Sequence, residues 1–310
     1  AALFLILVAV EFFLPLRSLG SAFHVAMNGA SAGRKIISLL NVPDPVWGEN
    51  EVSGTELKLN GVTFSYDGKR DVLKNVDMTF SEQGMTAIVG RSGCGKSTVV
   101  NMLVGAYRPK AGCVTVGGEV LENVTRESYY SRIASVSYNT YIFNDTVRAN
   151  FELAKKNASD EEIWNALAKV NLAEFIKENG GLDKVITEDA NNVSGGQKQR
   201  LALAVNLVAD KDIYVFDEAT SNIDIESEAV IMDNIKAMSK NKSVIVISHR
   251  LANVVPADNI YYMEEGEVRE HGSHAQLMSA QGCYAKLFNT QKALEEGYKE
   301  ITGATAEVIV

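Results

Sequence analysis

Hydrophobic and polar positions change pattern along this chain. The first fourteen residues, AALFLILVAVEFFL, are apolar except for Glu11, and residues 16–30 place apolar side chains at helical spacing. Beyond residue 54, short alternating or wholly apolar runs are separated by glycine and polar residues. The second pattern is typical of strands and helices in a mixed α/β domain.

Strands are predicted by several of the short runs. Residues 55–66 (TELKLNGVTFSY) and 72–80 (VLKNVDMTF) alternate apolar and polar positions around a DGKR turn, which predicts an antiparallel pair. Residues 85–90 (MTAIVG) form a short apolar run that leads into a glycine-rich loop. Residues 159–181 begin with the capping residue Ser159, continue with acidic residues and end in two glycines, which predicts a helical insert.

The apolar run at the N-terminus has three interpretations. As a helix it would be about 21 Å long, less than the roughly 30 Å apolar core of a bilayer. No basic region precedes it and no small-residue cleavage site follows it, which disfavours a signal peptide. A buried helix of a soluble protein remains open. Because the chain begins inside the run, we interpret it as the last half of a membrane helix, interrupted at Pro15 and continued by an amphipathic segment.

The domain organisation follows from a composition change at residues 41–54, NVPDPVWGENEVSG. This stretch holds two of the five prolines together with acidic residues and glycines, as linkers do. We therefore expect the last part of a transmembrane domain in residues 1–41 and a linker in residues 42–54. One folded domain is expected in residues 55–290, followed by a tail in residues 291–310.

Composition excludes some classes of protein. With 310 residues, of which 46% are hydrophobic and 22% charged, the chain can bury a sizeable core. The net charge of −9 argues against a general nucleic-acid binder, because such proteins cluster Lys and Arg against phosphates. The three cysteines, Cys94, Cys113 and Cys283, are widely spaced and form no C-x-x-C pair. We therefore expect them to be reduced thiols in a cytosolic domain.

The loop GRSGCGKST fits the Walker A pattern G-x-x-x-x-G-K-[ST] and lies between a predicted strand and a helical run. Its glycines let backbone N–H groups curl around an anion, and the helix N-terminus adds a positive dipole end. Lys96 would reach the β and γ phosphates of a bound nucleotide, and the Ser97 hydroxyl would ligate Mg²⁺. The residues expected to bind nucleotide here are Gly90, Arg91, Ser92, Gly93, Cys94, Gly95, Lys96, Ser97 and Thr98.

Two further apolar runs end in chemically active side chains. Residues 213–216 lead into Asp217 and Glu218, and residues 244–247 lead towards His249. Asp217 fits a Mg²⁺ ligand, and Glu218 fits a general base that polarises the attacking water. An acidic pair at a strand end can also simply face solvent, and a single histidine there is often structural. The presence of these residues in one chain with the glycine loop favours the catalytic interpretation.

Together with residues 192–200, NVSGGQKQR, these motifs resemble the ATP-binding-cassette (ABC) family over residues 55–290. The resemblance implies an α/β fold with a P-loop NTPase core, an antiparallel β subdomain and a helical insert. It also implies that adenine stacks on Tyr66, that residues 221–224 form the loop after the catalytic glutamate, and that His249 is the switch histidine.

The second glycine loop has a different role by this resemblance. In the family, two cassettes pair head to tail, and the SGGQ loop of one covers the γ-phosphate bound by the other. The residues that would hold the partner's ATP are Ser194, Gly195, Gly196 and Gln197. ATP would then join the two subunits, and its hydrolysis would release them.

The N-terminal segment resembles the exporter-type architecture, in which the final membrane helix is fused to the ATPase. This implies a plasma-membrane exporter of a small molecule or peptide, with its ATP-binding domain on the cytoplasmic side. The partner would be a second ABC subunit, identical or different. Residues 11–36 also resemble the corresponding region of the heterodimeric thiol exporters of cytochrome bd biogenesis.

Two positions depart from the family pattern. Val193 replaces the usual leucine of the signature loop, a mild change. Tyr138 stands where the family has a glutamine that touches Mg²⁺ and the attacking water, so its place beside Lys96, Glu218 and His249 among the catalytic positions is in question. Tyr138 motivates one alternative to an exporter, a regulatory half with impaired hydrolysis. The other alternative is a soluble ABC-class ATPase in which residues 1–41 are a docking helix.

Overall fold

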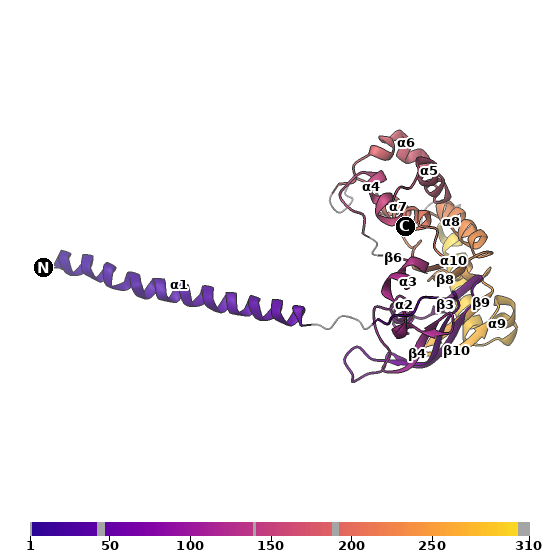
Figure 1. Cartoon of the computed structure of the whole chain (residues 1–310), viewed down its shortest axis with the longest axis horizontal. Coiled ribbons are helices and arrows are strands. Elements are labelled where there is room, and N and C mark those ends of the chain that lie inside the picture. The colour runs from indigo at the N-terminus through magenta and orange to yellow at the C-terminus, as the bar shows by residue number, and fades with distance from the viewer. Residues whose placement is uncertain (1, 42–46, 139–140, 188–191, 303–310) are drawn as a thin grey trace. The chain divides into compact units, whose positions relative to one another are not determined.

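The computed structural model describes residues 2–41, 47–138, 141–187 and 192–302, and the chain divides into two compact units, Ala1–Pro45 and Val46–Val310 (Figure 1). The first unit is a single helix, α1 (Ala2–Leu40), of 39 residues. The predicted interruption at Pro15 is wrong, because the helix continues through it. A proline removes one backbone donor, and the helical sequence on both sides keeps its conformation. None of the described helices is both long enough and apolar enough to cross a bilayer.

The second unit begins ahead of residue 55. The Trp47 ring lies 6.0 Å from the Tyr129 ring and 5.5 Å from the Tyr130 ring, and the Arg108 guanidinium lies 4.8 Å above it. Val52 is 5% exposed. Residues 47–54 are therefore packed against the folded unit, and a fragment that keeps the unit whole begins at Val46.

A four-stranded antiparallel sheet forms one part of this unit, in the order β2-β1-β4-β5. Its strands are β1 (Leu57–Phe64), β2 (Leu73–Phe80), β4 (Ala111–Val116) and β5 (Glu119–Val120). The predicted antiparallel pairing of the first two strands is confirmed, with Leu57 opposite Phe80. Their alternating apolar residues are buried on one face, as the sequence pattern required.

A six-stranded sheet forms the other part, in the order β10-β9-β3-β8-β7-β6. Its strands are β3 (Gly84–Gly90), β6 (Ile133–Ser137), β7 (Ile213–Asp217), β8 (Ser243–Ile247), β9 (Asn259–Glu264) and β10 (Glu267–Gly272). All neighbours are parallel except β9 and β10. Because β3, β8 and β7 are adjacent and parallel, the loops after their carboxyl ends meet at one edge of the sheet.

Helices cover this sheet and connect its strands. They are α2 (Lys96–Leu103), α3 (Arg126–Arg132), α4 (Val147–Ala154), α5 (Asp160–Lys169), α6 (Ala173–Glu178), α7 (Gly195–Val208), α8 (Ile225–Met238), α9 (His274–Ala280) and α10 (Cys283–Thr302). The predicted insert starts at Ser159 with a complete capping box. It forms two helices, separated by Asn171 in a left-handed conformation. The predicted tail lies partly in α10.

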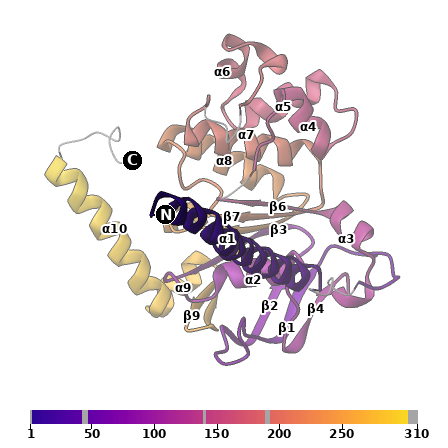
Figure 2. The same ribbon diagram turned by 90° about the vertical axis from the view of Figure 1, so that its left-hand side faces the viewer.

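Alternate residues of the six-stranded sheet enter two separate cores. Tyr214 and Phe216 belong to the core shared with α7, α8 and the insert, whereas Ile213 and Val215 face the core shared with α2 and the smaller sheet. Figure 2 shows α4–α8 on one side of the sheet and β1, β2 and β4 on the other. The sheet edge that carries the predicted site is thus supported from both faces.

Candidate nucleotide-binding and catalytic site

The glycine loop between β3 and α2 needs its glycines for steric reasons. Gly90, Gly93 and Gly95 have φ values of 151°, 77° and 110°, which side chains rarely adopt. A Cβ at Gly90 would clash with the carbonyl oxygen of Met263, and one at Gly95 would lie 2.9 Å from the Leu73 side chain. The loop therefore keeps a conformation that other residues would not allow.

Lys96 is the first residue of α2, and its side chain is turned back over the loop. Its Nζ donates to the carbonyl oxygens of Gly90 at 2.9 Å and Arg91 at 3.1 Å, and the residue is 5% exposed. The N-cap, Gly95, supplies no side-chain cap to the helix. A helix N-terminus beside an ammonium group favours an anion at this point.

A cavity of about 240 Å³ lies in front of this helix end. It brings together parts of the chain that are far apart in the sequence. Its lining residues are Val72, Ser92, Gly93, Gly95, Lys96, Ser97, Thr98, Glu218 and His249. The structure therefore places the glycine loop, the predicted base and the predicted switch histidine around one space.

Asp217, the last residue of β7, has the surroundings of a metal ligand. Burial raises the pKa of its carboxyl group, and the charge of Glu218 raises it further, while a Ser97 hydrogen bond, Lys96 and His249 oppose this. Its Oδ1 atom is buried and has no hydrogen-bond partner among the described residues. A carboxylate beside a serine hydroxyl is a donor set that suits Mg²⁺, so Ser97 and Asp217 fit that ion.

Asp217→Asn should raise the melting temperature of the nucleotide-free chain at pH 7.5, because the variant removes a charge that burial disfavours. With a raised pKa, the folded state takes up a proton more readily than the unfolded state. The penalty on the wild type is then present above the folded pKa and disappears as the pH falls towards the usual value of 3.8. The difference in melting temperature should therefore shrink as the pH is lowered towards 3.8.

Thermal unfolding followed by circular dichroism measures this, with Asp233→Asn as the control. Asp233 is exposed on α8, so its substitution removes the same charge without the burial. A lower melting temperature for Asp217→Asn at pH 7.5, or a difference that does not depend on pH, would contradict the prediction.

Glu218 and His249 are in direct contact. The Glu218 Oε1 atom lies 2.6 Å from His249 Nε2, and the Glu218 N–H donates to the Ile247 carbonyl at 3.0 Å. Glu218 has a φ of 54°, an uncommon value for a residue with a side chain. A carboxylate that lines the same cavity as Lys96 can accept a proton from water there, and His249 can hold its orientation.

Glu228 on α8 is hydrogen-bonded to the segments that follow β7 and β8. It is 5% exposed, and its Oε1 accepts hydrogen bonds from Thr220 Oγ1 and Asn253 Nδ2, both at 2.8 Å. Its Oε2 accepts from the Arg250 guanidinium. Sequence reasoning missed Glu228, because an acidic residue in the first turn of a helix is common and its partners are distant in the chain.

Two tyrosines lie near the cavity but do not line it. Tyr66 is exposed, its hydroxyl lies 3.0 Å from Thr98 Oγ1, and its ring packs edge-on against Phe64 and Tyr107. The Tyr138 N–H donates to the Asp217 carbonyl at 3.1 Å, and its side chain is exposed. Tyr66 is thus hydrogen-bonded to the first turn of α2, and the Tyr138 backbone lies beside the predicted metal ligand.

The second glycine loop opens α7. Ser194 is the N-cap, and it exchanges two hydrogen bonds with Gln197 in a capping box. A Cβ at Gly195 would meet no atom within 4 Å. None of these residues lines the cavity that contains Lys96. The first turn of α7 is therefore an open helix N-terminus, separate from the phosphate loop's cavity.

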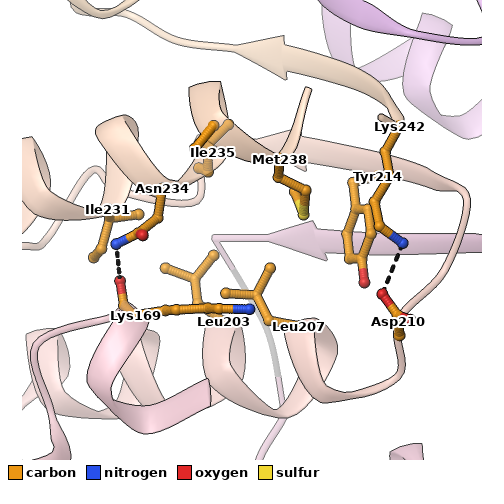
Figure 3. Close-up of a pocket in the computed structure, with 11 residues that line it drawn as sticks. Lys169, Leu203, Leu207, Asp210, Tyr214, Ile231, Asn234, Ile235, Met238 and Lys242 are labelled. Atoms are coloured by element: carbon orange, nitrogen blue, oxygen red, sulfur yellow. Dashed lines mark hydrogen bonds and ion pairs between the residues drawn. The ribbon is translucent and has the colours of Figure 1, made fainter. Parts of the chain in front are cut away.

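A second cavity, of about 210 Å³, lies between α7, α8 and β7 (Figure 3). Its walls are largely apolar, and an ion pair between Lys242 and Asp210 at 2.8 Å and a hydrogen bond from Asn234 to the Lys169 carbonyl lie at its rim. It contains none of the predicted site residues.

Comparison with known proteins finds relatives among ABC transporters. The family model described as "ABC transporter" matches residues 73–221. An uncharacterized ABC transporter ATP-binding protein of Haemophilus influenzae is 41% identical over 303 residues, covering 96% of this chain and 54% of the relative. An ATP-dependent lipid A-core flippase of Haemophilus ducreyi is 36% identical over 283 residues, covering 89% of this chain and 49% of the relative.

Among solved structures, a bacterial Atm1-family ABC exporter with ATP bound is similar to this chain, with a TM-score of 0.79 and 30% identity. The alignment covers 91% of this chain and 51% of that one. The chain thus spans about half the length of the relatives it matches.

Proposed function

This chain belongs to the ABC transporter family through its ATP-binding domain, and from that premise we propose that it is the ATP-hydrolysing part of an exporter. The observation that carries the proposal is the cavity lined by Lys96, Ser97, Glu218 and His249 together. The likeness to an Atm1-family exporter supports an export function, and the matched lengths support a larger parent protein.

ATP would place its phosphates in the glycine loop, where Lys96 exchanges the carbonyls of Gly90 and Arg91 for phosphate oxygens. Mg²⁺ held by Ser97 and Asp217 would neutralise phosphate charge. Glu218 accepts the proton of the attacking water, and His249 keeps the carboxylate in position. The exposed Tyr66 ring offers a face for adenine.

A second ABC subunit, identical or different, would complete the site. The loop from Ser194 to Gln197 opens a helix of 14 residues, and Gly195 leaves space for a phosphate to approach its backbone. Each chain would then offer one phosphate loop and one covering loop. ATP binding closes the pair, and hydrolysis lets it open.

We place α1 at the plasma membrane, with the ATP-binding unit on the cytoplasmic side and a small molecule or peptide as cargo. Large apolar side chains of α1 are exposed, including Phe12, Phe13 and Leu19, and such surfaces need a partner or lipid.

The whole protein should therefore sediment with membranes and need detergent for extraction. Recovery of the whole protein from a detergent-free cytosol would overturn the export function.

Tyr138 is expected to make hydrolysis slow rather than absent. A phenol is a poorer Mg²⁺ ligand than a carbonyl or carboxylate oxygen, and the longer, rigid tyrosine does not place an oxygen where the glutamine carbonyl would lie. Tyr138→Gln should raise kcat by about tenfold, the value of one well-placed hydrogen bond of about 1.4 kcal/mol. The Kd for ATP should stay nearly constant, because the new contact forms in the transition state.

The measurement is steady-state phosphate release by residues 46–310 with the partner cassette present. Tyr141→Gln is the matched control, since Tyr141 is a similarly exposed tyrosine of the same loop region. A kcat that stays flat or falls in Tyr138→Gln would show that this tyrosine does not occupy a weakened metal and water contact.

A further inference from the structure

Gln199 has a buried side chain whose amide group both donates and accepts a hydrogen bond. It is 5% exposed on α7. Its Nε2 donates to the carbonyl oxygen of Glu218 at 3.2 Å, and its Oε1 accepts from the backbone N–H of Asn222 at 3.2 Å. One side chain of α7 therefore spans the turn that begins at the proposed catalytic base.

The backbone at Glu218 depends on its neighbours. Its φ of 54° lies in the left-handed region, which costs a residue with a side chain roughly 1–2 kcal/mol. Such a conformation persists only where the surroundings determine it. Besides Gln199, the Glu218 carbonyl accepts from Ser221 N–H at 3.3 Å and Ser221 Oγ at 3.0 Å. Among the described residues, Gln199 donates to this carbonyl from another element, α7.

The first turn of α7 packs against the same turn of the chain. A Cβ at Gly196 would lie 2.9 Å from the carbonyl oxygen of Asn222, so a larger residue would force the two segments apart. Gly196 belongs to the glycine loop, and Gln199 follows it by three residues, one helical turn. The glycine loop and residues 218–222 are therefore joined at two points, one steric and one through hydrogen bonds.

We propose that Gln199 is a positioning residue that couples the glycine loop of α7 to the Glu218 carboxylate of the same chain. The inference rests on the proposed function, in which that loop meets the nucleotide of the partner cassette. When the loop docks on the partner's ATP, a shift of α7 moves Gln199 and with it the Glu218 carbonyl. In each chain, contact with the partner's ATP thereby changes the position of the Glu218 carboxylate.

Two substitutions separate the donor and acceptor halves of the amide. Gln199→Glu keeps an oxygen for the Asn222 N–H and loses the donor to Glu218, whereas Gln199→Met keeps a similar length and loses both. In the full chain with its partner, we expect kcat to fall about 10–100-fold in both variants, since a misplacement of about 1 Å can cost 10²-fold. The Kd for ATP should change less than about twofold, because Gln199 does not line the cavity.

Asn206→Ala is the control on the same helix, because the Asn206 amide donates within α7 itself, to the Ala202 carbonyl. It should leave kcat unchanged. A pH series adds a second readout: burial raises the pKa of a carboxyl group, so lowering the pH protonates the new carboxyl group of Gln199→Glu and gives it an O–H donor. Its kcat relative to wild type should then rise, whereas that of Gln199→Met should not.

Hydrogen exchange tests the hydrogen bond between Gln199 and Asn222 without any ATP hydrolysis. The Asn222 amide should exchange faster in Gln199→Met and stay protected in Gln199→Glu, because only the first variant removes its acceptor. The proposal is overturned if kcat in both variants stays within about twofold of wild type. It is also overturned if kcat, ATP affinity and melting temperature all fall together, since that marks a purely structural role. A wild-type chain that binds ATP without hydrolysing it beside its partner would overturn the proposed function itself, and this inference with it.

Discussion

Glu218→Gln is expected to slow ATP hydrolysis by about 10²–10⁴-fold, the usual contribution of a general base. The amide keeps the shape of the carboxylate and can still hydrogen-bond to His249, which lies 2.6 Å from Glu218 in the wild type. It cannot take a proton from water. The Kd for ATP should stay within a few-fold of wild type, because the glycine loop, Lys96 and Ser97 are untouched.

Phosphate release and equilibrium ATP binding, measured on the same preparation, separate the two effects. Glu226→Gln on α8 is the control, because Glu226 is exposed and its substitution removes the same charge away from the cavity. If Glu218→Gln hydrolysed ATP within about tenfold of wild type, the base would have to be another residue.

Ser194→Asp is expected to weaken ATP-dependent pairing strongly while keeping α7 intact. Aspartate caps helices as well as serine does, so the hydrogen bond from the Gln197 N–H at the helix start should survive. The new carboxylate would meet the partner's γ-phosphate. Two unit charges 4 Å apart at an effective dielectric of about 20 repel by about 4 kcal/mol, so pairing should weaken by as much as about 10³-fold.

Ser194→Ala provides the comparison for this substitution. It removes the cap and one phosphate donor without adding charge, so it should weaken the pair less than Ser194→Asp does. Size-exclusion chromatography of the Glu218→Gln background with ATP and the partner reports both effects. An unchanged ATP-dependent pair in Ser194→Asp would show that this loop does not face a phosphate.

Local sequence signals predicted much of the fold. The alternation in residues 57–64 and 73–80 gave their antiparallel pairing correctly, because a strand with one buried face must alternate. The glycine loop identified the end of β3, because its spacing carries a steric requirement that few other sequences meet. The cap at Ser159 also lay three residues from its partner Glu162, so it could be recognised directly.

Features that depend on distant parts of the chain could not be predicted. Gln199 and Glu228 look ordinary in the sequence, and only folding brings them to the loops after β7 and β8. Trp47 lay in an apparent linker, but its aromatic neighbours come from α3. The helix through Pro15 shows the same limit, because a local penalty at one residue did not end a helix with favourable sequence on both sides.

The central claim is that ATP lies between the phosphate loop of this chain and the Ser194 loop of another cassette. Light scattering on the Glu218→Gln form of residues 46–310, with bound ATP counted in the same fractions, tests this most directly. The account predicts that Mg²⁺ and ATP convert monomers, together with the partner cassette if it is a different chain, into a pair that holds ATP at its interface. One ATP bound per chain with no change in mass, even with the partner present, would contradict it.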